Sequence, residues 1–142
     1  TRMKKLIVFF GIIAVVATFS VQAQSFKYTV KASADCTNRT VDFTVPTGKV
    51  AKLMQMDIIA SWSSCNESQP APTSNWARVT EASQSTGRAK TKVLYKKTVD
   101  AAGHATESVP IQDVKLNPGT YTLEICKAQG AEATLTIFLG AN

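Results

Sequence analysis

The chain has 142 residues, with 16 Lys and Arg against 10 Asp and Glu, and a formal net charge of +6 at pH 7. Three of the basic residues, Arg2, Lys4 and Lys5, lie in an N-terminal segment that we expect to be removed, which leaves +3. A net charge this small does not by itself indicate a nucleic-acid or membrane partner.

The N-terminal segment has the pattern of a secretory signal peptide. Lys4 and Lys5 precede an apolar run over residues 6–19, and small residues up to Ala23 close it as a signal peptidase requires. The run is shorter than the roughly 20 residues of a membrane span, so we expect cleavage and no stable span afterwards; a retained anchor is the alternative. Residues 1–23, two of which precede Met3, are therefore predicted to form a signal-peptide helix. Residues 24–142 are predicted to form a single domain that a bacterium exports to its periplasm or its surroundings.

Alternation of apolar and polar residues predicts strands along the mature chain. The predicted strands cover residues 26–33, 39–45, 49–62, 76–82, 88–99, 106–116, 120–125 and 133–139. Residues 49–62 also fit helical spacing, but the alternation from Met54 to Trp62 favours a strand. Pro110 indicates that its strand lies at an edge of a sheet or contains a bulge.

The last two predicted strands organise the expected fold. Tyr121, Leu123 and Ile125 share one face of the first strand, and the second strand has a similar apolar face. We expect the two to form a hairpin across a turn at residues 127–131. A hairpin alone is marginal in water and needs a second layer. With about eight short strands in all, the sequence predicts an all-β fold, an antiparallel β-sandwich or jelly roll.

Three cysteines remain after cleavage, in a chain bound for an oxidising compartment. One disulfide and one unpaired thiol is the simplest arrangement. We expect Cys36 to pair with Cys65, because both lie at ends of predicted strands where loops can bring them together. Cys126 is then left as a small buried residue, or alternatively as the source of an intermolecular bridge.

A short run near the C-terminus resembles a known family. Leu116, Pro118, Gly119, Tyr121 and Leu123 follow the spacing Leu-x-Pro-Gly-x-Tyr-x-Leu. This run resembles the later strands of bacterial secreted β-sandwich modules, in particular the pre-peptidase C-terminal domains. The resemblance implies an accessory module used for binding or secretion, with no chemistry of its own.

The residue patterns do not indicate catalysis. His104, the only histidine, lies in a Gly-containing turn, and no nearby Ser or Cys has a nucleophile signature. The cysteines lack the spacing and the companion histidines of a zinc site, and the acidic residues lack the spacing of a calcium loop. We therefore expect no enzymatic activity, no metal and no cofactor.

Two tryptophans bracket a polar loop that predicts a carbohydrate site. An indole offers an apolar face on which a sugar can stack, and nearby amides hydrogen-bond its hydroxyls. The candidate ligand-binding residues are Trp62, Asn66, Gln69, Asn75 and Trp76. The alternative is that both tryptophans pack in the core.

A second candidate surface is basic. Arg88, Lys90, Lys92 and Lys96 would share one face of a strand and meet an acidic polysaccharide, lipid headgroups or an acidic protein. The alternative is a solvated face or a charged edge that blocks aggregation. Nucleic acid is not expected, because the protein is exported and few aromatics accompany the charges.

The first functional hypothesis is therefore an exported, non-enzymatic binding module for a carbohydrate or a cell-surface polymer. One alternative is a small periplasmic domain that docks on an envelope protein as an inhibitor or accessory subunit; exposed apolar residues on an edge strand would favour it. The other is a structural subunit that self-assembles, which an exposed Cys126 or an unpaired terminal strand would favour.

Overall fold

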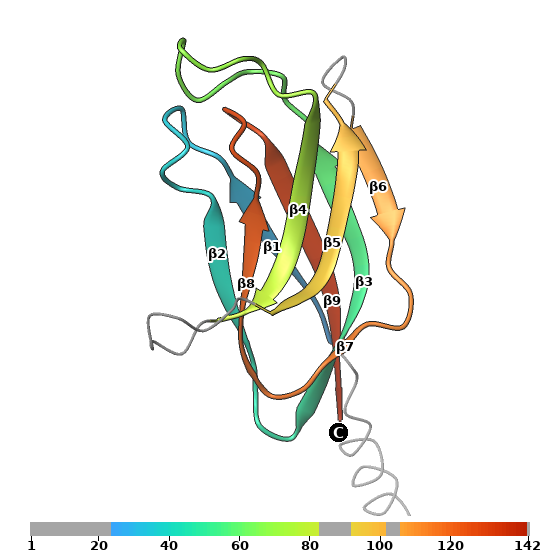
Figure 1. Cartoon of the computed structure of the whole chain (residues 1–142). Coiled ribbons are helices and arrows are strands. Elements are labelled where there is room, and N and C mark those ends of the chain that lie inside the picture. The colour runs from blue at the N-terminus through green and yellow to red at the C-terminus, as the bar shows by residue number, and fades with distance from the viewer. Residues whose placement is uncertain (1–23, 83–91, 102–105, 142) are drawn as a thin grey trace, which may run out of the picture.

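The computed structural model describes residues 24–82, 92–101 and 106–141, which form nine strands in two antiparallel sheets (Figure 1). The strands are β1 (Gln24–Lys31), β2 (Thr40–Val45), β3 (Lys49–Ile59), β4 (Ser74–Glu81), β5 (Val93–Asp100), β6 (Thr106–Pro110), β7 (Lys115–Leu116), β8 (Gly119–Ile125) and β9 (Glu132–Ala141). The predicted all-β fold is confirmed for these residues, which contain no helix. The predicted signal-peptide helix lies outside them.

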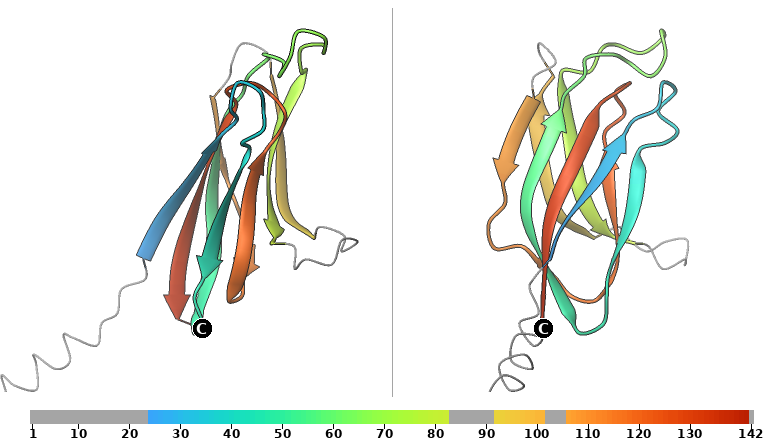
Figure 2. Two further views of the ribbon diagram at one scale, coloured as in Figure 1. Left: turned by 90° about the vertical axis from the view of Figure 1, so that its left-hand side faces the viewer. Right: turned by 180° about the vertical axis from the view of Figure 1, so that it is seen from behind.

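The two sheets lie face to face as the layers of a β-sandwich (Figure 2). The five-stranded sheet has the order β1-β9-β3-β6, and β7 also pairs with β3; the four-stranded sheet has the order β2-β8-β4-β5. The strand that ends at Pro110 is therefore an edge strand, as predicted. Most successive strands belong to opposite sheets, so the chain crosses repeatedly from one layer to the other.

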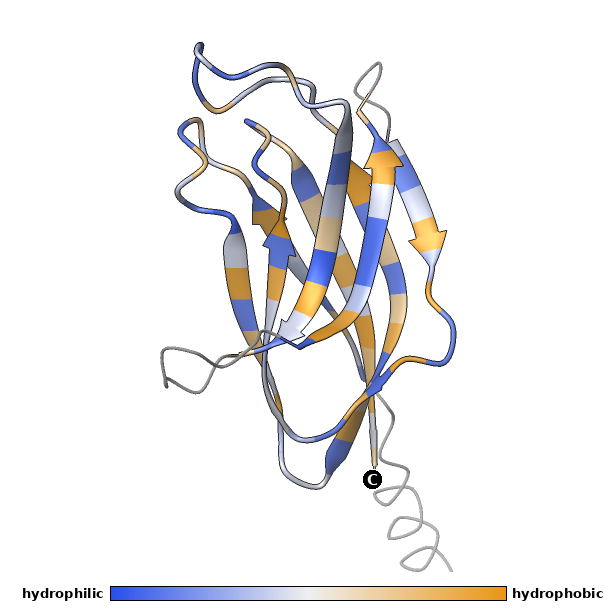
Figure 3. Ribbon diagram, viewed as in Figure 1, coloured by the Kyte–Doolittle hydropathy of each residue, from blue (hydrophilic) through white to orange (hydrophobic). Residues whose placement is uncertain are grey.

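The core lies between the layers and follows the predicted alternation. On β8 the side chains of Tyr121, Leu123 and Ile125 are buried, and on β9 Leu135 and Ile137 are completely buried. Figure 3 shows the resulting alternation of apolar and polar residues along these strands. Each such Leu or Ile stabilises the fold by roughly 1.5–3 kcal/mol relative to an exposed position.

The predicted hairpin between the last two long strands is wrong. β8 pairs with β2 and β4, whereas β9 pairs with β1 and β3 in the other sheet. The segment between them crosses the end of the sandwich, where Ala128 and Ala131 are buried and the N–H of Gly130 donates to the carbonyl of Ala32. An alternating pattern determines which face of a strand is apolar, but it does not determine the neighbouring strand.

The ambiguous segment is a strand, as predicted, but a change of register interrupts its alternation. β3 shifts its pairing with β9 between Leu53 and Gln55. Leu53 before the shift and Met56 and Ile58 after it face the core, while Met54 is 39% exposed. A β-bulge of this kind inserts one residue and reverses the faces on either side. The alternation predicted from Met54 to Trp62 therefore holds only from Met56 to Ala60: β3 ends at Ile59, and Trp62 is 46% exposed in the loop that follows.

The Leu-x-Pro-Gly-x-Tyr run has a structural role at the start of β8. The hydroxyl of Tyr121 donates a 2.6 Å hydrogen bond to the carbonyl of Asn117. Gly119 adopts a φ of 156°, a value that glycine accepts more easily than other residues. This arrangement resembles the tyrosine corner that recurs in β-sandwiches of many functions. The relation to pre-peptidase C-terminal domains stays a prediction.

Candidate functional site

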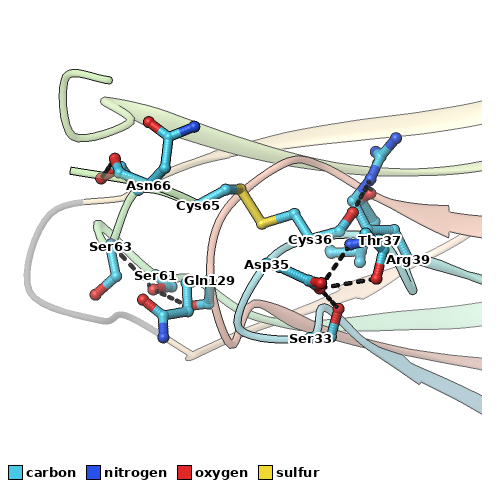
Figure 4. Close-up of a disulfide and its surroundings, with 12 residues drawn as sticks. Ser33, Asp35, Cys36, Thr37, Arg39, Ser61, Ser63, Cys65, Asn66 and Gln129 are labelled. Atoms are coloured by element: carbon cyan, nitrogen blue, oxygen red, sulfur yellow. Dashed lines mark hydrogen bonds between the residues drawn. A yellow bond between two sulfur atoms is a disulfide. The ribbon is translucent and has the colours of Figure 1, made fainter. Parts of the chain in front are cut away.

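A disulfide joins two loops at one end of the sandwich. Cys36 follows β1 and Cys65 lies in the long loop between β3 and β4, and their sulfurs are bonded with a Cα–Cα distance of 5.6 Å (Figure 4). The predicted pairing is confirmed. Cys126 is free and buried, and desolvation raises the pKa of its thiol. It packs as a small core residue, as the first of the two predicted alternatives requires.

A buried hydrogen-bond network lies beneath the long loop. The side chain of Asn75 is 0% exposed; its Oδ1 accepts from the N–H of Ser61 and its Nδ2 donates to the carbonyl of Ser61, both at 2.9 Å. The Ser61 hydroxyl donates to the carbonyl of Gln129 at 2.7 Å, and the N–H of Gln129 donates to the carbonyl of Ser63 at 2.8 Å. The backbone is thus fixed on both sides of Trp62.

The two loops and the β8–β9 turn surround an open hollow of about 470 Å³. It is lined by Ala34, Trp62, Ser63, Ser64, Cys65, Asn66, Glu67, Ala71 and Gln129, and we call it the loop hollow. Trp62 is 46% exposed and contributes the large apolar surface. The other side chains include two amides, two hydroxyls and one carboxylate. An aromatic ring beside hydrogen-bonding groups of this kind is suited to binding a hydroxylated ligand.

The predicted ligand-binding residues divide between the loop hollow and other places. Trp62 and Asn66 line it. Gln69 is exposed on the same loop but is not among the lining residues. Asn75 is buried beneath the loop and is not available to a ligand. Trp76 lies on β4, outside the loop hollow.

Further lining residues were not among the sequence candidates. Ser63, Ser64 and Glu67 lie in the loop that the tryptophans bracket, so their polar character was a usable signal. Gln129 lies in the turn that the sequence placed inside a hairpin, so nothing in the local pattern linked it to this loop. Its position depends on the crossing between β8 and β9.

Trp76 is part of a separate cluster on the outer face of the four-stranded sheet. The guanidinium of Arg78 lies 4.8 Å from the centroid of the Trp76 ring, and the ammonium of Lys96 lies 5.2 Å from it. Glu124 holds the cluster, since its Oε1 accepts from Arg78 Nε at 2.6 Å and its Oε2 lies 3.5 Å from Arg39 Nη1. The protein's own cations therefore pack on this indole.

The predicted basic stripe is described only in part. Arg88 and Lys90 lie outside the described residues. Lys92 Nζ lies 3.8 Å from Glu81 Oε1, and Lys96 packs on Trp76. The pairing of β4 with β5 shifts register between Val79 and Thr80, which interrupts the alternation that would place both lysines on one face.

One carboxylate beside the loop hollow has a perturbed pKa. The Asp35 Oδ1 accepts from the Thr37 hydroxyl at 2.8 Å, the Ser33 hydroxyl at 2.8 Å and the Thr37 N–H at 3.1 Å. These bonds, with that of the Thr37 hydroxyl the most important, lower its pKa from 3.8 to about 2. Asp35 therefore stays ionised and stabilises the turn that contains Cys36, which has a φ of 61°.

Neither a metal site nor a membrane helix is found in the part of the chain that the structure describes. In residues 24–82, 92–101 and 106–141, no group of three or more His, Cys, Asp or Glu side chains is placed to hold a metal ion. The same residues contain no helix long and apolar enough to cross a membrane.

Comparison with known proteins relates the chain to others only through its fold. No protein-family model and no curated protein matches it. Among solved structures, it is similar to a crystal structure of the Drosophila NLP core, described as giving insight into pentamer formation and histone binding. The TM-score is 0.51 at 14% sequence identity, over 84% of this chain and 99% of that chain. At this identity the similarity extends to the β-sandwich fold alone.

Proposed function

We propose that the protein is an exported, non-enzymatic binding domain that recognises a carbohydrate or cell-surface polymer at the loop hollow. The observation that carries the proposal is the exposed indole of Trp62, with Asn66 and Gln129 lining the same hollow. A sugar has an apolar face and a set of hydroxyl groups. The indole can stack on the apolar face, and the amides can form hydrogen bonds with the hydroxyls.

The disulfide and its loops support both export and binding. A Cys36–Cys65 bond is compatible with an oxidising compartment such as the periplasm or the exterior of the cell. The predicted signal peptide at residues 1–23 would deliver the chain there. The same bond ties together two of the segments that surround the loop hollow, which reduces the ordering that a ligand must impose on binding.

The strand order supports the jelly-roll form of the sandwich. Apart from the two-residue β7, the strands divide four and four between the sheets. Each successive strand then crosses to the other sheet, except from β4 to β5, which pair as a hairpin. Lectin domains are among the proteins that use jelly rolls, although the fold by itself assigns no ligand.

The test is binding of the purified exported protein to an array of bacterial envelope and plant glycans. Trp62→Ala should weaken binding of any captured glycan at least about tenfold, because a stacked tryptophan typically contributes more than 1.4 kcal/mol. Phe138→Ala is the matched control, since Phe138 is 42% exposed on β9 and does not line the loop hollow. The proposal would be overturned if Trp62→Ala left glycan binding unchanged, or if the protein bound no glycan on the array.

Docking on an envelope protein is the second candidate, and exposed edge residues favour it. Val93 on β5 is 44% exposed and Phe26 on β1 is 37% exposed, and both strands are sheet edges. Val93→Lys should then abolish capture of a stoichiometric protein partner while leaving glycan binding unchanged. Self-assembly has less support, because Cys126 is buried and β9 is paired on both sides.

A further inference from the structure

The lining of the loop hollow differs in charge from the chain around it. Residues 24–142, the predicted exported chain, have 13 Lys and Arg against 10 Asp and Glu. Among the described residues that line the loop hollow, the charged side chain is the exposed carboxylate of Glu67. Lys and Arg side chains do not occur in this lining set. A ligand that enters therefore meets a negative charge in an otherwise basic protein.

The neighbouring charges preserve this negative character. Asp35 follows the lining residue Ala34 and is held ionised by its hydrogen bonds to Ser33 and Thr37. The guanidinium of Arg39 is directed elsewhere, since Nε donates to the carbonyl of Cys36 and Nη1 to that of Ile125, with Glu124 nearby. Lys127 is exposed in the β8–β9 turn but does not line the loop hollow.

We propose that Glu67 biases the ligand preference of the loop hollow toward neutral and amino sugars and against sugars that carry carboxylates or sulfates. This inference rests on the proposed carbohydrate function. A carboxylate accepts hydrogen bonds from two sugar hydroxyls, and it binds an ammonium with the added attraction of opposite charges. It repels an acidic sugar, and such a repulsive element is an effective source of specificity.

The test compares oligosaccharides of equal length and linkage in neutral, amino and carboxylated form, such as oligomers of glucose, glucosamine and glucuronic acid. Glucosamine oligomers should bind most tightly and glucuronic acid oligomers most weakly. Glu67→Gln should weaken binding of the amino form and strengthen binding of the acidic form, each by about two- to fivefold, the range of an exposed charge pair. The neutral form should change by less than about twofold, and added salt should reduce both charge effects.

Two further variants separate the possible failures. Glu107→Gln removes an exposed carboxylate on β6, outside the loop hollow, and should leave the order of the three forms unchanged. If the acidic form binds best and this binding requires Trp62, the inference about Glu67 fails while the carbohydrate function stands. If Trp62→Ala alters the binding of none of the three forms, the carbohydrate function fails together with the inference.

Discussion

Asn75 supports the candidate site from beneath. Its amide is completely buried and both of its polar atoms bond to the backbone of Ser61, next to Trp62. Asn75→Ala would leave the N–H and the carbonyl of Ser61 unsatisfied. Each unsatisfied buried group costs about 1–3 kcal/mol, so we expect the free energy of unfolding to fall by at least about 2 kcal/mol.

Urea denaturation measures this loss, and Asn38→Ala is the control. Asn38 is an exposed asparagine at the same end of the sandwich, and its loss should change stability by less than about 0.5 kcal/mol. Equal stabilities of the two variants would show that the Asn75 hydrogen bonds do not hold the loop.

Asp35 makes stability depend on pH in a predictable direction. Its folded pKa of about 2 lies below the ordinary 3.8, so the folded state favours the ionised form. The stabilising contribution is therefore complete well above pH 3.8 and is lost as the pH falls toward 2. Asp35→Asn should be less stable than the wild type near neutral pH, and the difference should shrink under acidic conditions. Urea denaturation across this pH range tests it; a difference independent of pH would contradict the assignment.

At the scale of elements, the disulfide determines how firmly the β1–β2 and β3–β4 loops are held together. Cys36 and Cys65 are separated by 29 positions and close a loop that contains all of β2 and β3. Replacing both with serine should lower the free energy of unfolding by about 3–4 kcal/mol, because the unfolded chain regains conformational freedom. Trp62-dependent ligand binding should weaken as well, since the two loops that surround the loop hollow are no longer joined by a covalent bond.

Thermal unfolding with and without reductant measures the disulfide contribution. Reductant should lower the Tm of the wild type and leave that of the double serine variant unchanged. Cys126→Ala serves as the control, because it removes the free thiol and should keep the reductant sensitivity. A wild type that is insensitive to reductant would show that the crosslink contributes little.

For the whole molecule, stability depends on the central strands that face the shared core. Leu135 on β9 is completely buried and lies opposite Tyr28 on one side and Met56 on the other. Leu135→Ala should lower the free energy of unfolding by about 2–5 kcal/mol through lost burial and the resulting cavity. Thr136→Ala, the next residue along on the outer face, should cost less than about 1 kcal/mol. Chemical denaturation compares the two, and similar losses would mean that the inward face of β9 is assigned incorrectly.

The molecule also keeps its two candidate surfaces apart. The loop hollow lies at the disulfide end, with Glu67 as its charged lining residue, whereas the Trp76 cluster lies on the outer face of the four-stranded sheet and contains Arg78 and Lys96. The cations of the Trp76 cluster pack on the indole and pair with Glu124, so they do not contribute to the charge of the loop hollow.

The sequence by itself determined which face of β2, β8 and β9 is apolar, because alternation with a period of two is a local property of the chain. Tyr121, Leu123 and Ile125 were assigned to the core from this pattern alone, and the structure confirms it. The pairing of Cys36 with Cys65 was also predicted correctly, because an oxidising compartment favours a disulfide and both residues lie in loops that follow predicted strands. The polar composition of residues 63–75 likewise identified the loop that contains Asn66, whereas Trp62 was placed in the preceding strand and lies in the loop instead.

The tertiary structure alone decided which strands are neighbours and which side chains meet. β8 and β9 follow each other in the chain but belong to different sheets, because each is stabilised by hydrogen bonds to strands distant in sequence. This crossing places Gln129 in the loop hollow, and the packing beneath the long loop removes Asn75 from solvent. Such contacts depend on how the two sheets pack over the core, and the local periodicity of the sequence does not determine that packing.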